Sequence, residues 1–414
     1  MKEKKLKRII LFCKELTGVG GGERLMFEEA QFFKNQNIDV KILTFKFDRE
    51  VLFDNSFDIN IEEVKYKHYC FLPFRLISKI FSLRKKIKEL GPDLINAHYF
   101  FDTIYLFWST LFTGIPYTTH MHVTIFWYEN ERSLLKYALV HRKAFREIIN
   151  SVPGHRDFTP LEPPERTIFF WIKNEIIAIL LYLGIKGARK IFVHSKQMQW
   201  ETEKLYRKKA VSLKGAFHTD IFNYKVKKNV HAHLGLNGKK MIFHMSRLDP
   251  RKRIDLLLRA FKKISLLRDD VWLVIGGKGS DETRLKNLVR DLNITDRIIF
   301  LGYIPEQELW DYYASCDIFA YPEWIDFSLC PYEALAFGKK SIWASEMEID
   351  DNLKKSRLIF QVDPTPDEFA KAIERALEIT VNEKRGEDIL RGYTWERYFN
   401  QLQKGMREVI IGGA

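Results

Sequence analysis

The sequence predicts two α/β domains in tandem, each built around a doubly wound parallel sheet. At 414 residues the chain is too long for one ordinary domain. Short apolar runs alternate with stretches of helical periodicity, which is typical of βαβ units. A polar linker at 223–240 interrupts this alternation, which then starts again. We therefore expect a first domain over residues 1–222 and a second over 223–394.

The first domain is expected to begin with a strand and a glycine-rich turn. "RIILFC" (8–13) is a short apolar run rich in branched residues, and "GVGGGER" (18–24) follows it and opens a helix. Further strands are predicted at 40–45, 93–98, 117–122 and 190–195, with an apolar helix near 101–112.

The second domain repeats this rhythm. Strands are predicted at 241–246, 272–277, 298–302, 318–322 and 341–345, and helices at 253–264, 282–292 and 331–337. In doubly wound folds ligands bind outside the carboxyl ends of the strands. Residues directly after each strand are therefore the candidates for a site, and a cleft between the domains would add to it.

The charge balance is compatible with three kinds of partner. The net charge is +13, which suits nucleic acid, an anionic membrane or phosphorylated small molecules. A lysine-rich solvated surface is the alternative that needs no partner. Paired Cys/His finger spacing and RNP-like aromatic motifs are both missing from the sequence, so we expect no nucleic-acid partner.

The cysteines and the first residues indicate the compartment. The four cysteines are scattered and form no CxxC pair, which favours a reducing compartment and argues against a structural zinc. The N-terminus is basic and then only briefly apolar, too short for a signal peptide. We expect a cytoplasmic protein.

Two cations five residues apart follow the predicted strand at 241–246. Arg247 lies just beyond the strand, Asp249 is a good N-cap, and Pro250 is a good first helical residue. Lys252 then falls in the first helical turn, where free N–H groups and the helix dipole already favour anions. The pattern predicts a diphosphate site, with two solvated loop cations as the alternative.

Two further stretches support a nucleotide ligand. Glu333 is expected early in a helix that starts near Pro331, where its carboxylate can accept from both hydroxyls of a ribose. An ordinary first-turn glutamate is the alternative. Gly20, Gly21 and Gly22 open the first helix, where backbone without side chains lets a phosphate or sugar come close. A plain tight turn is the alternative there.

Taken together, these segments resemble a known enzyme family. The motifs are "GVGGGERLMFEEAQFF", "SRLDPRKRIDLLLRAF", "LVIGGKGSDETRLKNLV", "IIFLGYIPEQELWDYYASCDIFAYPE", "PYEALAFGKK" and "YTWERYFNQL". In this order and spacing they resemble the family-4 retaining glycosyltransferases of the GT-B fold over almost the whole chain. "GVGGGER" is most similar to the mannosyltransferases of lipid-linked oligosaccharide assembly. The resemblance implies two Rossmann-like domains, with a C-terminal helix at about 395–414 packing back on the first.

The resemblance also implies roles for individual residues. Arg247 and Lys252 would hold the donor diphosphate and stabilise the leaving group, and Glu333 would hold the ribose. His122 would stand beside the reacting sugar, with His98 and His120 as candidates on the acceptor side. The remaining donor-binding candidates are Gly20, Gly21, Gly302, Tyr303, Ile304, Ser328 and Leu329.

Several positions depart from the family pattern. The family has two glutamates seven residues apart, and the first of these positions is Ile325 here. Either Asp326 or Glu323 takes over that contact from a shifted backbone, or the contact is lost; Asp326 is the catalytic candidate. Arg253 replaces a glycine after Lys252 and would add a cation near the diphosphate. Other departures are Ser328 and His218.

Three segments raise the question of an acceptor or membrane. Residues 124–170 form an insertion that is a candidate acceptor or membrane element. The apolar segment 171–185 is interrupted by charge and too short to span a bilayer, so we expect a buried helix. Residues 74–90 combine an apolar stripe (Leu76, Ile80, Leu83, Ile87 and Leu90) with basic side chains. Such a helix could lie on an anionic surface or pack on the sheet.

The sequence therefore predicts a glycosyltransferase that moves mannose or another hexose from a GDP- or UDP-linked donor to a glycan or lipid-linked hydroxyl. We expect retention of configuration, with no metal and no cofactor. The protein would be cytoplasmic, or would contact the cytoplasmic face of an anionic membrane. The alternatives are a nucleotide-sugar epimerase or sugar phosphorylase on the same fold, and a catalytically weak partner subunit.

Overall fold

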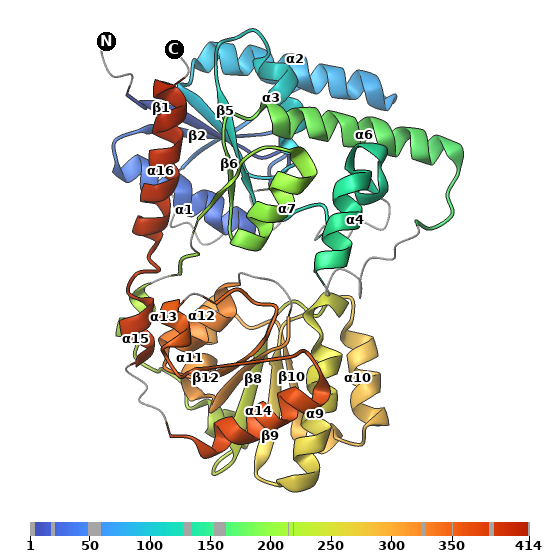
Figure 1. Ribbon diagram of the computed structural model, residues 1–414. Helices are drawn as coiled ribbons and strands as arrows, with labels where there is room; N and C mark the ends of the chain where they lie inside the picture. Colours follow the sequence, from blue (N-terminus) through green and yellow to red (C-terminus); the bar gives the residue numbers. More distant parts are fainter. Residues whose placement is uncertain are drawn as a thin grey trace. The chain divides into compact units, whose positions relative to one another are not determined.

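The computed structural model describes residues 5–17, 21–48, 59–126, 134–152, 163–213, 215–217, 219–323, 328–349, 351–380 and 385–412. The chain divides into two compact units, Met1–Lys214 with Glu396–Ala414, and Gly215–Trp395. Each unit contains one parallel α/β sheet, as the sequence predicts (Figure 1). The expected division at 222/223 falls a little later than the observed one, because Phe217 and Ile221 already belong to the core of the second unit.

The first unit is built on a seven-stranded sheet in the order β3-β2-β1-β4-β5-β6-β7. Its strands are β1 (Arg8–Phe12), β2 (Asp39–Thr44), β3 (Asn60–Glu63), β4 (Leu94–Ala97), β5 (Tyr117–Met121), β6 (Ile191–Val193) and β7 (Val211–Ser212). The edge strands β3 and β7 were not predicted because neither contains an apolar run. The strand order reverses between β1 and β4, which is the topological switch point where ligands bind in such folds.

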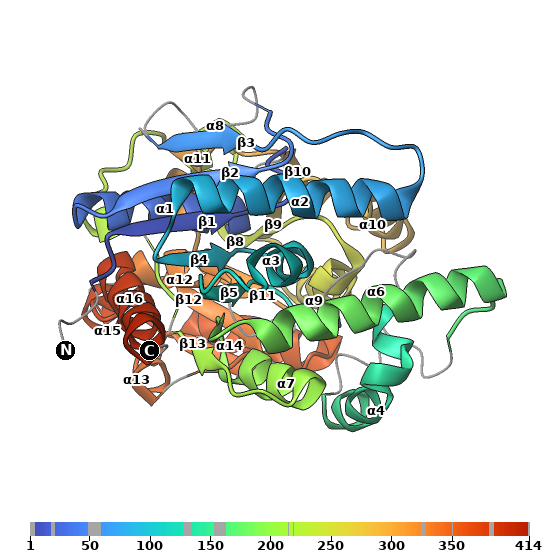
Figure 2. The same ribbon diagram turned by 90° about the horizontal axis from the view of Figure 1, so that it is seen from above.

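Seven helices are described in the first unit. They are α1 (Gly21–Asn35), α2 (Leu72–Leu90), α3 (Asp102–Thr110), α4 (Arg142–Ser151), α6 (Ile168–Gly187), α7 (Lys196–Tyr206) and α16 (Trp395–Ile411). Helices α2, α3 and α6 lie side by side with α3 in the middle (Figure 2). Helix α16 packs on this unit through the Phe32–Phe399 ring contact and the Lys190–Glu408 ion pair.

The second unit contains a six-stranded sheet in the order β10-β9-β8-β11-β12-β13, with its switch point between β8 and β11. Its strands are β8 (Lys240–Met245), β9 (Val271–Gly276), β10 (Ile298–Gly302), β11 (Ile318–Tyr321), β12 (Lys340–Ala344) and β13 (Ile359–Val362). Its helices are α8 (Val230–Leu234), α9 (Ile254–Leu267), α10 (Glu282–Asp291), α11 (Glu306–Ser315), α12 (Leu329–Ala336), α13 (Asp351–Lys354), α14 (Pro366–Glu378) and α15 (Arg385–Leu390).

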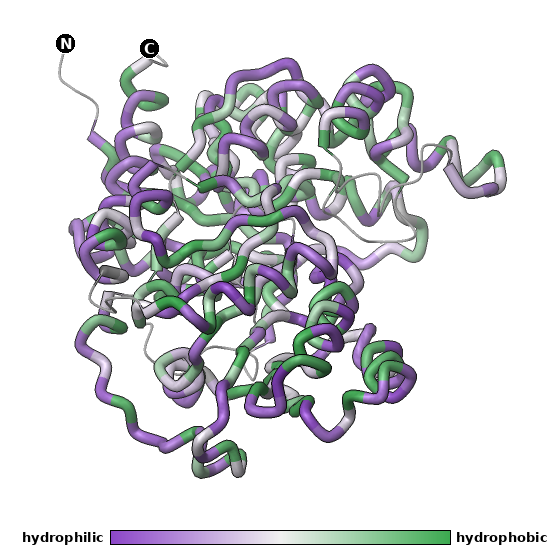
Figure 3. Tube along the Cα trace, turned by 60° about the horizontal axis from the view of Figure 1, so that its bottom comes forward, coloured by the Kyte–Doolittle hydropathy of each residue, from purple (hydrophilic) through white to green (hydrophobic). Residues whose placement is uncertain are grey.

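Both faces of the second sheet are buried. In β8, Ile242 belongs to the core shared with α9 and α14, whereas Phe243 belongs to the core shared with α11 and α12. Successive side chains of a strand point to opposite faces, so a strand buried on both sides reads as a continuous apolar run. The helices mix hydrophobic and hydrophilic residues (Figure 3), as expected of helices that cover a sheet.

The expectation that the apolar segment 171–185 forms a buried helix is wrong. The segment belongs to α6, which is longer than predicted, and only 28% of its most apolar window is buried. One face packs on α3, where Gly184 lies against the backbone of Thr103, while Phe169 on another face is 80% exposed. Among the described residues, α6 is the one helix whose length and composition would allow it to cross a membrane, which by itself establishes no span.

Candidate functional site

The second unit presents its cations at the switch point of its sheet. Arg247 follows β8 and is exposed, and its guanidinium makes no hydrogen bond or ion pair with the described residues, although its carbonyl oxygen accepts from the Ser246 hydroxyl. A short 3-10 turn, Pro250–Lys252, comes next, and Asp249 caps it by accepting from the Arg251 N–H at 3.0 Å. Lys252 therefore ends this turn instead of lying within the following helix, because α9 begins only at Ile254.

Lys252 forms an ion pair across the switch point. Its ammonium contacts Glu323, two residues after the end of β11, and the hydroxyl of Tyr321 donates to the same carboxylate. Glu323 is only 2% exposed, so a cation is needed to offset the cost of burying its charge. Glu323, one of the two out-of-register carboxylates, thus lies beside the predicted diphosphate lysine. Ile325, Asp326 and Phe327 lie outside the described residues.

Arg253 does not act as the extra diphosphate cation that the sequence suggested. Its backbone is left-handed (φ 49°), a conformation that favours glycine and explains why the family pattern has one there. Its guanidinium is buried and paired with Glu346, which follows β12. This ion pair accommodates the departure from glycine, and Arg247 and Lys252 remain the two cations of the predicted diphosphate site.

A glycine-rich loop after β9 packs directly on the Arg247 loop. A Cβ on Gly277 would lie 1.8 Å from the carbonyl oxygen of Ser246, and one on Gly279 would lie 2.0 Å from that of Leu248. The Leu248 N–H also donates to the Lys278 carbonyl at 3.0 Å. Only glycine fits this backbone approach. No role is predicted for this loop from the sequence, although its GGKG run directly after a strand could have indicated a close backbone approach.

The predicted base-binding segment and ribose carboxylate lie on the same edge. Gly302 ends β10 with φ 67°, and its carbonyl accepts from the Gly277 N–H at 2.7 Å. Tyr303 is exposed, whereas Ile304 is buried, so Ile304 could meet a ligand only through its backbone. Ser328 and Leu329 start α12, two residues earlier than predicted. Glu333 is buried in the second turn of that helix.

In the first unit, α1 begins against the ends of neighbouring strands. A Cβ on Gly22 would lie 2.6 Å from the Tyr99 hydroxyl oxygen and 3.4 Å from Cδ2 of His122, whereas Gly21 has open space. The Tyr99 hydroxyl donates to Glu23 at 2.5 Å. Gly22 therefore lets the helix start close to His122. Gly20 lies outside the described residues.

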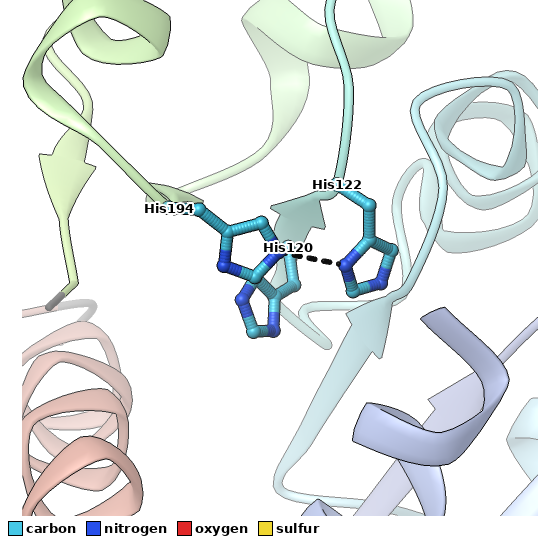
Figure 4. Close-up of side chains that lie close together, drawn as sticks. All are labelled: His120, His122 and His194. Atoms are coloured by element: carbon cyan, nitrogen blue, oxygen red, sulfur yellow. Dashed lines mark hydrogen bonds between the residues drawn. The ribbon is translucent and has the colours of Figure 1, made fainter. Parts of the chain in front are cut away.

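Four histidines gather at the carboxyl ends of β4, β5 and β6. His98 Nδ1 lies 3.3 Å from His122 Nε2. On its other side, His122 Nδ1 lies 3.0 Å from His194 Nε2, and Figure 4 shows this pair together with His120. His194 was missed, although "IFVHS" ends a strand with histidine just as "LINAH" does. Burial first, and then the neighbouring histidines, keep the pKa of His122 well below its usual value. His122 is therefore a neutral hydrogen-bonding group at pH 7.

His98 and His120 occupy the interior of this cluster. Both side chains are fully buried, so neither is placed to touch an acceptor directly. His120 Nε2 lies 2.6 Å from the Tyr398 hydroxyl of α16, which also lies 3.1 Å from His194 Nδ1. The structure thus brings the three predicted histidines together but leaves only His122, with the unpredicted His194, partly exposed.

Two family models match the chain. Residues 19–154 match the description "Glycosyltransferase Family 4" and residues 226–389 match "Glycosyl transferases group 1". The chain belongs to the family-4 glycosyltransferases of the GT-B kind. An uncharacterized glycosyltransferase of Methanocaldococcus jannaschii is 30% identical over 168 residues, 39% of this chain and 43% of the relative. A GDP-mannose-dependent phosphatidylinositol monomannoside mannosyltransferase of Mycolicibacterium smegmatis is 26% identical over 44% of this chain and 46% of the relative.

These matches span less than half the length of either relative. Solved structures are similar over nearly the whole chain. HepE of Anabaena in complex with UDP has a TM-score of 0.68 at 15% identity, covering 97% of this chain and 99% of its own. Sucrose-phosphate synthase of Thermosynechococcus elongatus has a TM-score of 0.73 at 16% identity, covering 98% and 100%. At these identities the similarity establishes the GT-B fold alone.

Proposed function

We propose that the protein is an active, retaining glycosyltransferase that moves mannose or another hexose from a GDP- or UDP-linked donor to a hydroxyl group. The observation that carries this proposal is a pair of cations at the switch point of the second unit, which we call the clamp: the exposed Arg247, and Lys252, which is paired with Glu323. The exposed Arg247 guanidinium can bind phosphate oxygens through two parallel hydrogen bonds, and Lys252 adds a point charge.

The clamp would act mainly on the leaving group. When the glycosidic bond breaks, negative charge develops on the diphosphate, and fixed cations stabilise it more in the transition state than in the ground state. Lys252 is already held by Glu323, so its ammonium is oriented before a donor arrives. The proposal needs no metal, because Arg247, Lys252 and backbone N–H groups supply the positive charge.

Within the first unit, the residues proposed to meet a sugar are uncharged. A neutral His122 can exchange hydrogen bonds with a sugar hydroxyl without adding a charge that would oppose a cation-like sugar. Gly21 and Gly22 keep the start of α1, which lies close to His122, free of side chains. The buried His98 and His120 would act by orienting His122, since His98 is within 3.3 Å of it.

We propose a lipid-linked acceptor. The mannosyltransferase of Mycolicibacterium smegmatis is named for a phosphatidylinositol mannoside, and a Streptococcus pneumoniae relative is named alpha-monoglucosyldiacylglycerol synthase. A Campylobacter jejuni relative is named for a diphospho-undecaprenol substrate. These names concern the relatives, and they support the same class of acceptor here.

A lipid surface would also suit the outer face of the first unit. The predicted stripe of α2 faces inward, with Leu83 and Ile87 fully buried. A second apolar row faces outward beside the exposed apolar residues of α6. The exposed residues are Phe71, Phe74, Ile77 and Phe81 at α2, Phe112 after α3, and Ile168, Phe169, Ile172, Ile176, Ile179 and Leu183 on α6. We call these the apolar rows.

Cations border the apolar rows, which favours an anionic membrane over an uncharged partner. Arg75, Lys85 and Lys88 are exposed on α2. Three other basic residues of that helix are already engaged. Arg84 donates to the Leu111 carbonyl, Lys86 pairs with Glu62, and the ammonium of Lys79 lies over the ring of Phe45. Only the outward set would meet lipid headgroups.

Co-sedimentation with vesicles tests this membrane contact. We expect binding to vesicles rich in phosphatidylserine, weaker binding at high salt, and little binding to neutral vesicles. Changing Ile172 and Ile176 together to Glu should abolish it, whereas the matched double change of the exposed Leu266 and Leu267 in the second unit should not. Equal recovery in the supernatant under all conditions, or self-association through the rows, would contradict it.

Donor turnover tests the enzyme itself. We expect GDP- or UDP-hexose to be hydrolysed slowly alone and faster with a lipid-linked glycan acceptor. An epimerase would instead return an isomeric donor, a phosphorylase would require phosphate, and a weak partner subunit would bind the donor without turnover. Any of these three outcomes would contradict the proposed glycosyl transfer.

A further inference from the structure

Three buried polar atoms converge in the first unit, where a carboxylate lies within ion-pair distance of two imidazole rings. They are Oε2 of Glu29 on α1, Nε2 of His98 after β4 and Nδ1 of His120 in β5. None has a hydrogen-bond partner among the described residues, and all three side chains are completely buried. Burying a polar atom without a partner costs free energy, and burying a carboxylate costs more. Three such atoms in one place therefore indicate a ligand that satisfies all of them.

The separations of these atoms suit a tetrahedral metal ion. Oε2 of Glu29 lies 3.1 Å from His98 Nε2 and 3.6 Å from His120 Nδ1, and all three atoms lie within 4.8 Å of one another. With metal–ligand bonds of about 2.1 Å, two ligand atoms of a tetrahedral ion stand about 3.4 Å apart. Although 3.1 Å is also within hydrogen-bond range, the Glu29–His98 contact does not have hydrogen-bond geometry.

The outer polar atom of each residue is already engaged. Oε1 of Glu29 accepts from the Asn96 amide at 2.9 Å. The Thr118 hydroxyl donates to Oδ1 of the same Asn96 side chain and so fixes its orientation. His98 Nδ1 lies 3.3 Å from His122 Nε2, and His120 Nε2 lies 2.6 Å from the Tyr398 hydroxyl. Metal-binding histidines and carboxylates characteristically have such partners on their far side, which fix the ring orientation and the tautomer.

We propose that Glu29, His98 and His120 bind one Zn²⁺ ion inside the first unit, with a water molecule as the fourth ligand. Two imidazoles and one carboxylate form a ligand set that zinc accepts. The sequence predicts no metal, and its scattered cysteines argue only against a structural zinc bound by cysteine pairs. Histidine spacing could not reveal this site, because its ligands come from three separate segments of the chain.

The ion would fix the proton positions of the neighbouring histidines. With Nε2 bound to zinc, His98 must carry its proton on Nδ1 and donate to His122 Nε2. His122 then carries its own proton on Nδ1 and donates to His194, 3.0 Å away. The zinc would thus orient His122 without touching a substrate. The inference goes beyond the proposed function, because metal binding by the first unit does not depend on whether sugar is transferred.

Metal analysis of the full chain without a histidine tag tests the proposal. After growth with added zinc we expect about one zinc per chain, removed by a strong chelator and restored by zinc alone, with a higher Tm in the zinc-bound form. Glu29→Gln and His98→Gln should each weaken zinc binding at least ten-fold in competition with a chromophoric chelator. The matched control is His141→Gln, a buried histidine of the same unit outside the cluster, whose Nε2 also has no partner among the described residues.

Each possible result either supports or contradicts the zinc site. Zinc lost in the two cluster variants and retained in the control supports the site. If either cluster variant fails to fold, the wild-type stoichiometry and the zinc-dependent change in Tm still decide. Wild-type protein that holds no zinc and shows no change in Tm would overturn the proposal. The carboxylate of Glu29 and the two imidazoles would then share a proton instead of a metal ion. Zinc held equally by all variants would also overturn it.

Discussion

The two units carry opposite chemistry at the same place in the same topology. At the switch point of the second unit, the buried Glu323 is paired with Lys252 while Arg247 remains exposed. At the edge of the first unit, the buried Asp102 has one oxygen without a hydrogen-bond partner among the described residues. One edge pairs its buried carboxylate with a cation and exposes a second cation, and the other buries a carboxyl that no cation pairs within the described part of the chain. The fold therefore sets where a site forms, and the side chains after each strand set what it binds.

The largest expected effect concerns Asp102. Burial raises the pKa of this carboxyl to about 7, although the Lys14 N–H donates to it at 3.0 Å. Above pH 4 the unfolded chain is deprotonated while the folded chain still binds the proton, so stability falls as pH rises from about 4 to 7. Asp102→Asn keeps an acceptor for Lys14 and should be more stable than the wild type at pH 8, by up to about 4 kcal/mol.

Urea unfolding at pH 4 and pH 8 measures this effect. Glu323→Gln is the contrasting variant, because it weakens the pairing of Lys252 and should lower stability at pH 8. If both substitutions shift the unfolding midpoint in the same direction, the difference drawn between a paired and an unpaired buried carboxyl is wrong.

The next effect concerns the two glycines that start α1. Gly22→Ala forces a methyl group to within 2.6 Å of the Tyr99 hydroxyl, which must move. We expect a loss of about 1–3 kcal/mol from this overpacking. Gly21→Ala is the matched control, since its Cβ meets nothing within 4 Å. Thermal unfolding of the two variants compares them, and equal Tm values would contradict the close approach.

The third effect concerns the cations of the second unit. Arg247→Ala and Lys252→Ala should each lower kcat/KM for donor hydrolysis at least ten-fold, about 1.4 kcal/mol of transition-state stabilisation. Lys263→Ala is the control, because Lys263 lies on α9 in an exposed pair with Asp367. Near-normal turnover in both clamp variants would remove the diphosphate assignment.

The site of the second unit was more predictable than that of the first, and the reason is contiguity. Arg247, Asp249, Pro250 and Lys252 lie within one strand-to-helix connection, so local capping and charge already indicate an anion site. Glu29, His98, His120, His194 and Tyr398 come from five segments that only the fold brings together. Sequence could suggest single histidines there, but not their hydrogen bonds.

The errors in the predicted elements also have physical causes. Helix α6 was expected to be buried because the segment is strongly apolar, yet α3, α7 and the short turns at 135–141 leave part of its apolar surface exposed, including Phe169. The outward row of α2 was overlooked because the inward stripe, containing Leu83 and Ile87, accounts for the helical periodicity by itself. Apolar composition predicts that a surface will be covered, but it does not identify what covers it.

Isothermal titration of the wild-type protein with GDP and UDP, repeated with Arg247→Ala, tests the central claim most directly. The account predicts that one of the two nucleotides binds at a single site, at least ten-fold more weakly when Arg247 is removed, and unchanged in Lys263→Ala. Binding of neither nucleotide, or equal binding by the wild type and Arg247→Ala, would contradict the claim that this edge of the second unit holds a nucleoside-diphosphate donor.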